Sequence, residues 1–303
     1  MLKIAFHPCY QHPLKANHRF PMEKYDLIPK QLRLEGICNP EHFFEPTIET
    51  STEKYIQMVH SQAYLDAMYN LKLDRKAIRK IGFPLSEALV KRERLITNAT
   101  LQATKFALQN GVGMNIAGGT HHAFPDHGEG FCMINDQATA SYFLLEETQV
   151  EKILIIDLDV HQGNGTAAVF QNEPRVFTFS MHGKSNYPFK KEKSDLDIPL
   201  ENGCNDATYL SVLKEHLPAL MESVKPDFVF YLSGVDILET DKLGKLSCSV
   251  EGCRQRDAYV LNLIKEHQLP LEISMGGGYS KDIKHIINAH TNTYRLVQDL
   301  FFI

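Results

Sequence analysis

Short apolar runs that end in glycine or polar residues recur along the chain, and they constrain its fold more than any other feature. The clearest runs cover residues 2–6, 114–117, 153–158, 176–180, 228–232 and 271–275. Their near-continuous hydrophobicity is typical of strands that are covered on both faces. Amphipathic segments of helix length lie between them, at residues 86–110, 136–147, 207–223, 251–266 and 281–297. This alternation predicts an α/β fold with a mostly parallel central sheet and crossover helices.

The chain is long enough to bury one large core. Its 303 residues are 43% apolar, and no internal repeat or low-complexity linker divides them. We therefore expect a single domain over residues 1–303. The first hundred residues are less regular, and we expect a helix there around residues 55–71.

Charge and hydropathy argue against several classes of partner. The 32 basic and 37 acidic residues give a net charge of −5 and form no Lys/Arg block, so we expect no direct nucleic-acid binding. No apolar stretch reaches the ~18 residues of a membrane span, and we expect neither a span nor a secretion signal. The six scattered cysteines, without a CxxC pair, favour reduced thiols in a cytoplasmic protein. We take the chain to be a monomer.

Five of the predicted strands end in polar or metal-binding residue types beside glycine. These strand ends lie at residues 117–122, 157–161, 180–183, 233–236 and 274–279. In an open parallel sheet the carboxyl ends of the strands meet at one edge and form the ligand-binding crevice. The pattern therefore indicates an enzyme whose site is built from segments far apart in the sequence.

The strand end at residues 157–161 carries two carboxylates and one imidazole. Alternate residues of an extended backbone share a face, so Asp157, Asp159 and His161 should point the same way. These ligands suit Zn²⁺, Fe²⁺ or Mn²⁺, and carboxylates leaving an apolar strand are costly without a cation. Asp236, at another strand end, would complete three ligands and leave coordination open for water and substrate. Taken singly, each could instead be a solvated strand end or a turn cap.

His121 and His122 follow two glycines at another strand end. They could move protons beside a metal-bound water, although each could equally be an ordinary core or surface histidine. A histidine with this role needs an acceptor on its second ring nitrogen, and Asp157 and Asn164 are available. An aspartate partner raises the pKa of its histidine whereas a neutral asparagine does not, so the two pairs should differ in protonation.

Tyr279 comes directly after three glycines, residues 276–278. Glycines permit close backbone approach, which can bring the phenol into a cavity where its hydroxyl stabilises a developing oxyanion. The alternative is a helix-opening turn followed by a boundary aromatic. No GxGxxG lies here, and residues 128–130 and 163–165 are expected to be loops and not phosphate cradles.

Four motifs together resemble those of the zinc-dependent histone deacetylases, which share the arginase/deacetylase fold. They are Gly118-Gly119-Thr120-His121-His122-Ala123, Gly130-Phe131-Cys132-Met133-Ile134-Asn135-Asp136, Asp157-Leu158-Asp159-Val160-His161-Gln162-Gly163-Asn164-Gly165-Thr166 and Gly276-Gly277-Gly278-Tyr279. The resemblance covers nearly the whole chain and implies a three-layer α/β/α architecture. Residues 181–189 and 233–236 are most similar to the class IV branch and its bacterial relatives.

The resemblance implies a metal centre with defined ligands. Zinc would bind to Asp159, His161 and Asp236. A potassium ion would lie near Asp157, Asp159, His161, Ser180 and Met181.

The resemblance also implies catalytic roles for amide hydrolysis. Tyr279 would polarise the scissile carbonyl, and His122 would serve as general base and then general acid. His121, paired to Asp157, would be its electrostatic partner. Class I relatives carry aspartate where this chain has Asn164, so a pKa for His122 does not transfer from them.

The implied substrate is an acyl-lysine side chain of a protein or peptide. The residues expected to contact it are Gly130, Phe131, Leu243, Gly277 and an aromatic from Tyr187 or Phe189. The acyl group is left open between acetyl and a long-chain fatty acyl group.

Three other functions are compatible with these residues. A manganese ureohydrolase of the arginase type shares the fold, but Asn164 stands where a second metal would want a carboxylate. An acetylpolyamine amidohydrolase acts on a cationic substrate and is expected to carry an acidic residue at the channel rim, where this chain has Leu243. A non-enzymatic acyl-lysine-binding scaffold is disfavoured because the chemical residues are all present.

Overall fold

One parallel sheet of eight strands organises the computed structural model, which describes residues 1–302. The strands are β1 (Lys3–Ala5), β2 (Phe43–Phe44), β3 (Val112–Asn115), β4 (Ile153–Asp157), β5 (Val176–Gly183), β6 (Leu196–Leu200), β7 (Phe228–Leu232) and β8 (Leu271–Ser274). Their order is β2-β1-β3-β8-β7-β4-β5-β6, and every neighbouring pair is parallel. The predicted parallel sheet is confirmed, and all carboxyl ends lie at one edge.

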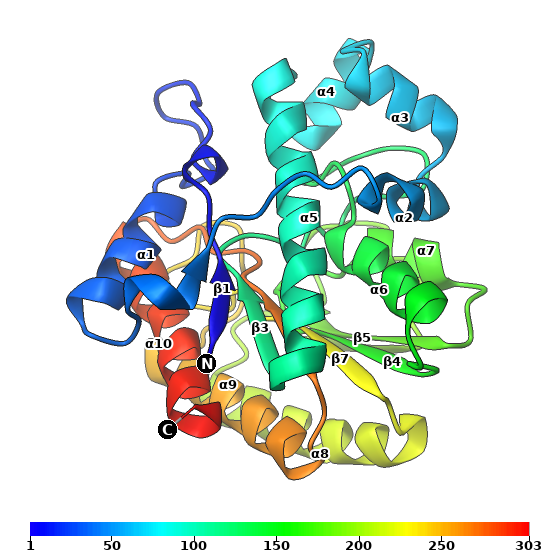
Figure 1. The fold of residues 1–303 in the computed structure, drawn as a ribbon. Helices are drawn as coiled ribbons and strands as arrows, with labels where there is room; N and C mark the ends of the chain where they lie inside the picture. Colours follow the sequence, from blue (N-terminus) through cyan, green and yellow to red (C-terminus); the bar gives the residue numbers. More distant parts are fainter. Residues whose placement is uncertain (303) are drawn as a thin grey trace.

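Helices cover both faces of this sheet. They are α1 (Lys24–Leu34), α2 (Thr52–Val59), α3 (Gln62–Tyr69), α4 (Arg75–Ile81), α5 (Glu87–Asn110), α6 (Asp136–Glu147), α7 (Asn164–Phe170), α8 (Asp206–Val224), α9 (Val250–Glu266) and α10 (Ile283–Phe301). Figure 1 shows α5 and α6 on one face and α9 and α10 on the other, which gives three layers. Within residues 1–302, no helix combines the length and apolarity that crossing a bilayer requires.

The apolar runs are continuous because each central strand packs against helices on both faces. In β4, Ile153 and Ile155 pack into the core cluster that holds the inward side of α6. Leu154 and Ile156, which alternate with them, belong to the larger core cluster on the other side. A strand whose two faces are both buried loses the polar alternation of a half-exposed strand.

The prediction of a single helix around residues 55–71 is wrong in one respect, because two helices, α2 and α3, occupy this region. α2 ends at Val59, and His60 takes an extended conformation with its Nδ1 2.9 Å from the carbonyl oxygen of Phe124. Ser61 then caps α3, its hydroxyl accepting a hydrogen bond from the backbone N–H of Tyr64. A serine N-cap starts a new helix at the point where apolar periodicity alone predicts continuity.

Gly113 in β3 packs directly against the backbone of α5. A Cβ on this residue would lie 2.0 Å from the carbonyl oxygen of Ala103. Because both atoms are held by backbone, we expect Gly113→Ala to lower the free energy of unfolding by about 2–3 kcal/mol, measured by urea denaturation. Gly36→Ala is the control, since its Cβ meets nothing within 4 Å and adds only the strain of a φ of 68°. Equal losses in the two variants would contradict the packing explanation.

Candidate functional site

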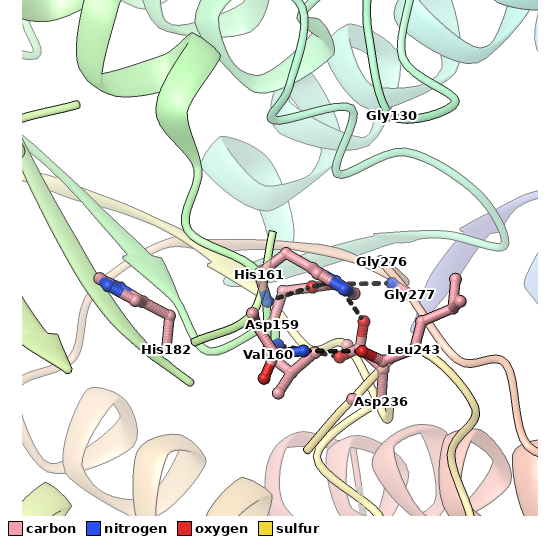
Figure 2. Close-up of polar contacts among 12 residues, drawn as sticks. Gly130, Asp159, Val160, His161, His182, Asp236, Leu243, Gly276 and Gly277 are labelled. Carbon is pink, nitrogen blue, oxygen red and sulfur yellow. Dashed lines mark hydrogen bonds and ion pairs between the residues drawn. The ribbon is translucent and has the colours of Figure 1, made fainter. Parts of the chain in front are cut away.

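Three buried side chains converge at the carboxyl edge of the sheet. Asp159 and His161 follow β4, and Asp236 follows β7, the neighbour of β4. His161 Nδ1 lies 3.0 Å from Asp159 Oδ1 and 3.1 Å from Asp236 Oδ2. One ligand atom from each residue lies within 4.8 Å of the others, and Figure 2 shows the side chains pointing toward one another. The structure thus brings together the three residues expected to bind a metal.

The backbone that presents these side chains is not the extended strand expected from the sequence. β4 ends at Asp157, and short-range hydrogen bonds shape the segment that follows. Asp157 Oδ1 accepts the backbone N–H of Asp159 at 3.1 Å, and Asp159 Oδ1 accepts that of His161 at 3.0 Å. Aspartate side chains that bond the backbone two residues on make turns, so the alternating-face argument fails beyond Asp157.

The remaining carboxylate oxygens are held by backbone N–H groups. Asp159 Oδ2 accepts from Gly277 and Asp236 Oδ1 accepts from Val160, each at 2.9 Å (Figure 2). One oxygen of each carboxylate is therefore left to face His161 Nδ1. The ligand atoms of a tetrahedral site with bonds near 2.0 Å lie about 3.3 Å apart, so this spacing fits a small divalent cation.

Burial and mutual contact shift the pKa values of these three groups. Burial alone would lower the pKa of His161, but hydrogen bonds with Asp159 and Asp236 raise it to about 10. Burial and the charge of Asp159 raise the pKa of Asp236 to about 7. Binding of a divalent cation at this cluster would therefore displace a proton from His161.

His121 is paired with a carboxylate. Its Nδ1 lies 2.7 Å from Asp157 Oδ2, and both side chains are buried. Burial alone would lower the pKa of His121, but the charges of Asp157 and Asp159 raise it above its ordinary value. This is the charged pair expected from the sequence.

His122 is paired with a neutral amide. Its Nδ1 lies 2.6 Å from Asn164 Oδ1, and its ring centroid lies 6.0 Å from that of His161. Burial, together with the nearby His121 and His161, lowers the pKa of His122 well below its ordinary value. The two adjacent histidines therefore differ in protonation, as the difference between their partners predicts.

Tyr279 lies at the end of the three-glycine loop and faces the cluster of Asp159, His161 and Asp236. Its backbone N–H donates to Asp241 Oδ2 at 2.6 Å, and its ring centroid lies 6.2 Å from that of His161. Burial, followed by the charges of Asp159 and Asp236, raises the pKa of the phenol well above its ordinary value. The hydroxyl therefore keeps its proton and can donate a hydrogen bond.

A cavity of about 390 Å³ leads from the surface to these residues. Its lining includes Gly130, Phe131, Tyr187, Phe189, Leu243, His122, His161 and Tyr279. Five of the six residues expected to contact substrate are therefore together in one channel. Both candidate aromatics contribute: Tyr187 packs edge-on against His122, with centroids 5.1 Å apart, whereas Phe189 is 91% exposed at the mouth.

The histone deacetylase domain family matches residues 18–294, which is most of the chain. This chain belongs to the histone deacetylase family. The resemblance carried by the four motifs is thereby confirmed. The similar proteins include an uncharacterized protein of Picosynechococcus sp., 40% identical over 98% of this chain and 99% of the relative.

Two further relatives of this histone deacetylase family member carry functional names. Histone deacetylase 2 of Arabidopsis thaliana is 28% identical over 89% of this chain and 72% of its own length. The acetoin utilization protein AcuC of Staphylococcus aureus is 27% identical over 92% of this chain and 74% of its own. The crystal structure of the HDA15 HD domain is similar with a TM-score of 0.81 over 99% of this chain and 91% of that one. At 20% identity this match concerns the fold, and it confirms the predicted arginase/deacetylase architecture.

A second, inner cavity beside Asp159 is present in this deacetylase-family chain. Its volume is about 40 Å³. Its lining includes Phe20, Arg92, Gly118, Cys132, Asp159, Gly277 and Tyr279. Gly277, the sixth residue expected to contact substrate, thus lies at the inner cavity and not in the outer channel.

The residues expected near potassium lie on adjacent strands. Asp157 of β4 and Ser180 of β5 are register partners, and Met181 follows Ser180 in the same strand. The hydroxyl of Ser180 lies 3.0 Å from His182 Nδ1.

Several site residues were not predicted from the sequence. Arg19, Lys80 and Lys245 line the mouth of the channel, but each comes from a loop or helix end without a recognisable motif. Lys24 is fully buried beneath the three-glycine loop, where its Nζ donates to the carbonyl oxygen of Gly276 at 3.1 Å. Burial lowers the pKa of Lys24 to about 8, against the opposing charges of Asp236, Asp159 and Asp241. A lysine in a helix is normally exposed, so no sequence signal indicated this position.

Proposed function

We propose that this protein is a zinc-dependent hydrolase that removes acetyl groups from lysine side chains of proteins or peptides. The observation that carries the proposal is the buried cluster of Asp159, His161 and Asp236 beside His122 and Tyr279 at the inner end of a channel. Family membership supports deacetylase chemistry, and the geometry supports the assignment of roles.

Asp159, His161 and Asp236 would hold the zinc ion. Two anionic ligands offset its +2 charge, which suits a neutral amide substrate, and three protein ligands leave coordination open. Bound there, zinc supplies Lewis acidity for the substrate carbonyl and lowers the pKa of water. Oxygen atoms of Asp157 and Ser180, side by side in the sheet, support the further proposal of a potassium site.

The protein groups would then move one proton and stabilise one charge. His122 donates Nδ1–H to Asn164, so its Nε2 is free to take a proton from the attacking water. The same nitrogen would return a proton to the departing lysine amine. The His121–Asp157 ion pair lies beside it, and the Tyr279 hydroxyl would donate to the oxyanion that develops on the amide oxygen.

The mouth of the channel disfavours a polyamine substrate. Arg19 and Lys245 line it together with Lys80, which is paired with Glu129 behind the wall, and none of the described residues of its lining carries a carboxylate. A cationic polyamine would be repelled, whereas an acylated lysine is neutral and can pass between Phe131 and Tyr187. This supports an acyl-lysine peptide over acetylspermidine.

We expect acetyl-lysine peptides to be better substrates than either myristoyl-lysine peptides or acetylspermidine. The inner cavity of about 40 Å³ has room for an acetyl group but not for a fatty acyl chain. A difference of about tenfold or more in kcat/KM is expected, because a mismatch of one methylene is already worth about 10–200-fold. Turnover of the three substrates, each with and without chelator, measures it.

Faster turnover of the myristoyl peptide would show that the inner cavity opens. It would then favour a long-chain fatty acyl group over acetyl as the preferred substrate group. Elemental analysis of the same purified protein tests the metal: one zinc per chain supports the proposal. Two manganese ions per chain would favour the ureohydrolase alternative.

A further inference from the structure

Glu129 lies directly behind the Asn164–His122 pair. Its Oε1 accepts a hydrogen bond from Asn164 Nδ2 at 2.6 Å, and its Oε2 lies 2.5 Å from Lys80 Nζ. Only 5% of its side chain is exposed, whereas 46% of that of Lys80 is. A buried carboxylate thus joins a surface ammonium group to the amide that contacts His122.

The two residues that follow Glu129 hold it in this place through their backbone. The N–H of Gly130 donates to the carbonyl oxygen of Lys80 at 3.0 Å, and that of Phe131 donates to Ile81 at 2.7 Å. These bonds fasten the loop to the last residues of α4. The position of the carboxylate therefore depends on the fold and not on the rotamer of a mobile surface side chain.

Glu129 can act only as an acceptor. Burial alone would raise its pKa, but the hydrogen bonds that it receives hold that pKa well below the usual range of a glutamate. An ionised carboxylate has no proton to donate. The group that faces Glu129 Oε1 must therefore be the NH₂ of the Asn164 amide.

This requirement determines which atom of Asn164 faces His122. An asparagine amide offers an oxygen on one side and an NH₂ on the other, and the two orientations have nearly the same shape. With its NH₂ turned to Glu129, Asn164 presents Oδ1 to His122 Nδ1, which must then carry the ring proton. The reversed amide would present NH₂ to Nδ1, and the proton would move to Nε2, where the ring could no longer accept one.

We propose that Glu129 is a positioning residue: it fixes the orientation of the Asn164 amide and thereby keeps His122 in the tautomer with a free Nε2. The inference rests on the proposed function, because that free nitrogen is the general base of the hydrolysis. It explains why a neutral asparagine suffices as the partner of His122 in this chain.

Glu129→Leu removes the acceptor and releases the amide. We expect kcat to fall by about 10–100-fold with KM nearly unchanged, a part of the roughly 10²–10⁴ that general-base catalysis contributes. Glu129→Gln keeps one carbonyl oxygen as an acceptor and should lose less. A fall confined to KM would overturn the proposal.

A compensating pair of substitutions separates this role from simple destabilisation. In Asn164→Asp, the new carboxylate would face that of Glu129 across a gap now bridged by a 2.6 Å hydrogen bond, so like charges should lower kcat. Adding Glu129→Gln supplies an NH₂ donor to that carboxylate and should restore most of kcat. A double variant no faster than Asn164→Asp alone would overturn the proposal.

The tautomer itself gives a readout that does not depend on turnover. In ¹⁵N-histidine-labelled protein, long-range proton–nitrogen spectra distinguish Nδ1–H from Nε2–H, and His122→Gln identifies the signal. Wild type should show Nδ1–H, and Glu129→Leu should shift the population toward Nε2–H. An unchanged tautomer refutes the inference, whereas a wild type with the expected tautomer but no deacetylation refutes only the proposed function.

Glu147→Gln is the matched control. Glu147 likewise pairs with a lysine: it accepts hydrogen bonds from Lys54 and from Tyr55, both at 2.8 Å, but it lies at the end of α6 away from the site. We expect its substitution to leave both kcat and the His122 tautomer unchanged. A loss of kcat equal to that of Glu129→Leu would show that any broken ion pair has this effect.

Discussion

His161→Ala should remove both the bound zinc and the hydrolytic activity. The imidazole supplies one of three converging ligand atoms, with its Nδ1 about equally distant from the facing oxygens of Asp159 and Asp236. Without it, two buried carboxylates of like charge face each other with no neutral ligand to complete the site. We expect zinc content near zero by elemental analysis and essentially complete loss of acetyl-lysine turnover.

His60→Ala is a suitable control for the loss of a buried imidazole. His60 Nδ1 is hydrogen-bonded to the carbonyl oxygen of Phe124, and its Nε2 accepts a hydrogen bond from the backbone N–H of Asn135. Neither partner is one of the three residues proposed to bind the metal. This variant should be less stable but should retain zinc. A stoichiometric zinc content in His161→Ala would remove His161 from the ligand set.

Tyr279→Phe should lower kcat by about 10²–10³, the typical cost of removing one oxyanion donor. The substitution deletes only the hydroxyl, because the ring still packs against Phe20 and Phe131 with centroids 5.8 and 6.0 Å away. Zinc content and the unfolding midpoint should stay close to those of the wild type. KM should change little, since the hydroxyl is expected to bind the developing charge more strongly than the ground state.

Tyr55→Phe provides the comparison, since it loses a hydroxyl bonded to Glu147 at a distance from the site. It should turn over at the normal rate. Near-normal kcat in Tyr279→Phe, with intact fold and zinc, would show that another group stabilises the oxyanion.

The sheet and its functional edge could be predicted because they depend on a local and repeated signal. Buried parallel strands require continuous apolar runs, and β7 over Phe228–Leu232 matches its predicted range. Parallel pairing then places the ends of β4 and β7 side by side, which brings together Asp159 and Asp236, 77 positions apart in the sequence. Elements with a weaker signal were missed, such as the two-residue β2 and the Pro-containing β6.

The parts of the site that could not be predicted depend on tertiary contacts. Glu129 was expected in a loop, but its contact with Asn164 joins segments 35 residues apart. Asn164, also expected in a loop, is the first residue of α7. Lys24 contacts Gly276 only because α1 packs beneath the three-glycine loop. Motif spacing identifies residues that share a strand end, whereas these partners come from other layers of the fold.

Because all eight strands run in one direction, every turn that leads back into a central strand lies at the edge opposite the chemistry. The return turns at residues 148–152, 171–175, 225–227 and 267–270 are thus spatially insulated from the reacting groups. Such positions are natural points for fused tags, reporter domains or surface tethers. The protein could be anchored there with its open face toward the surrounding solution.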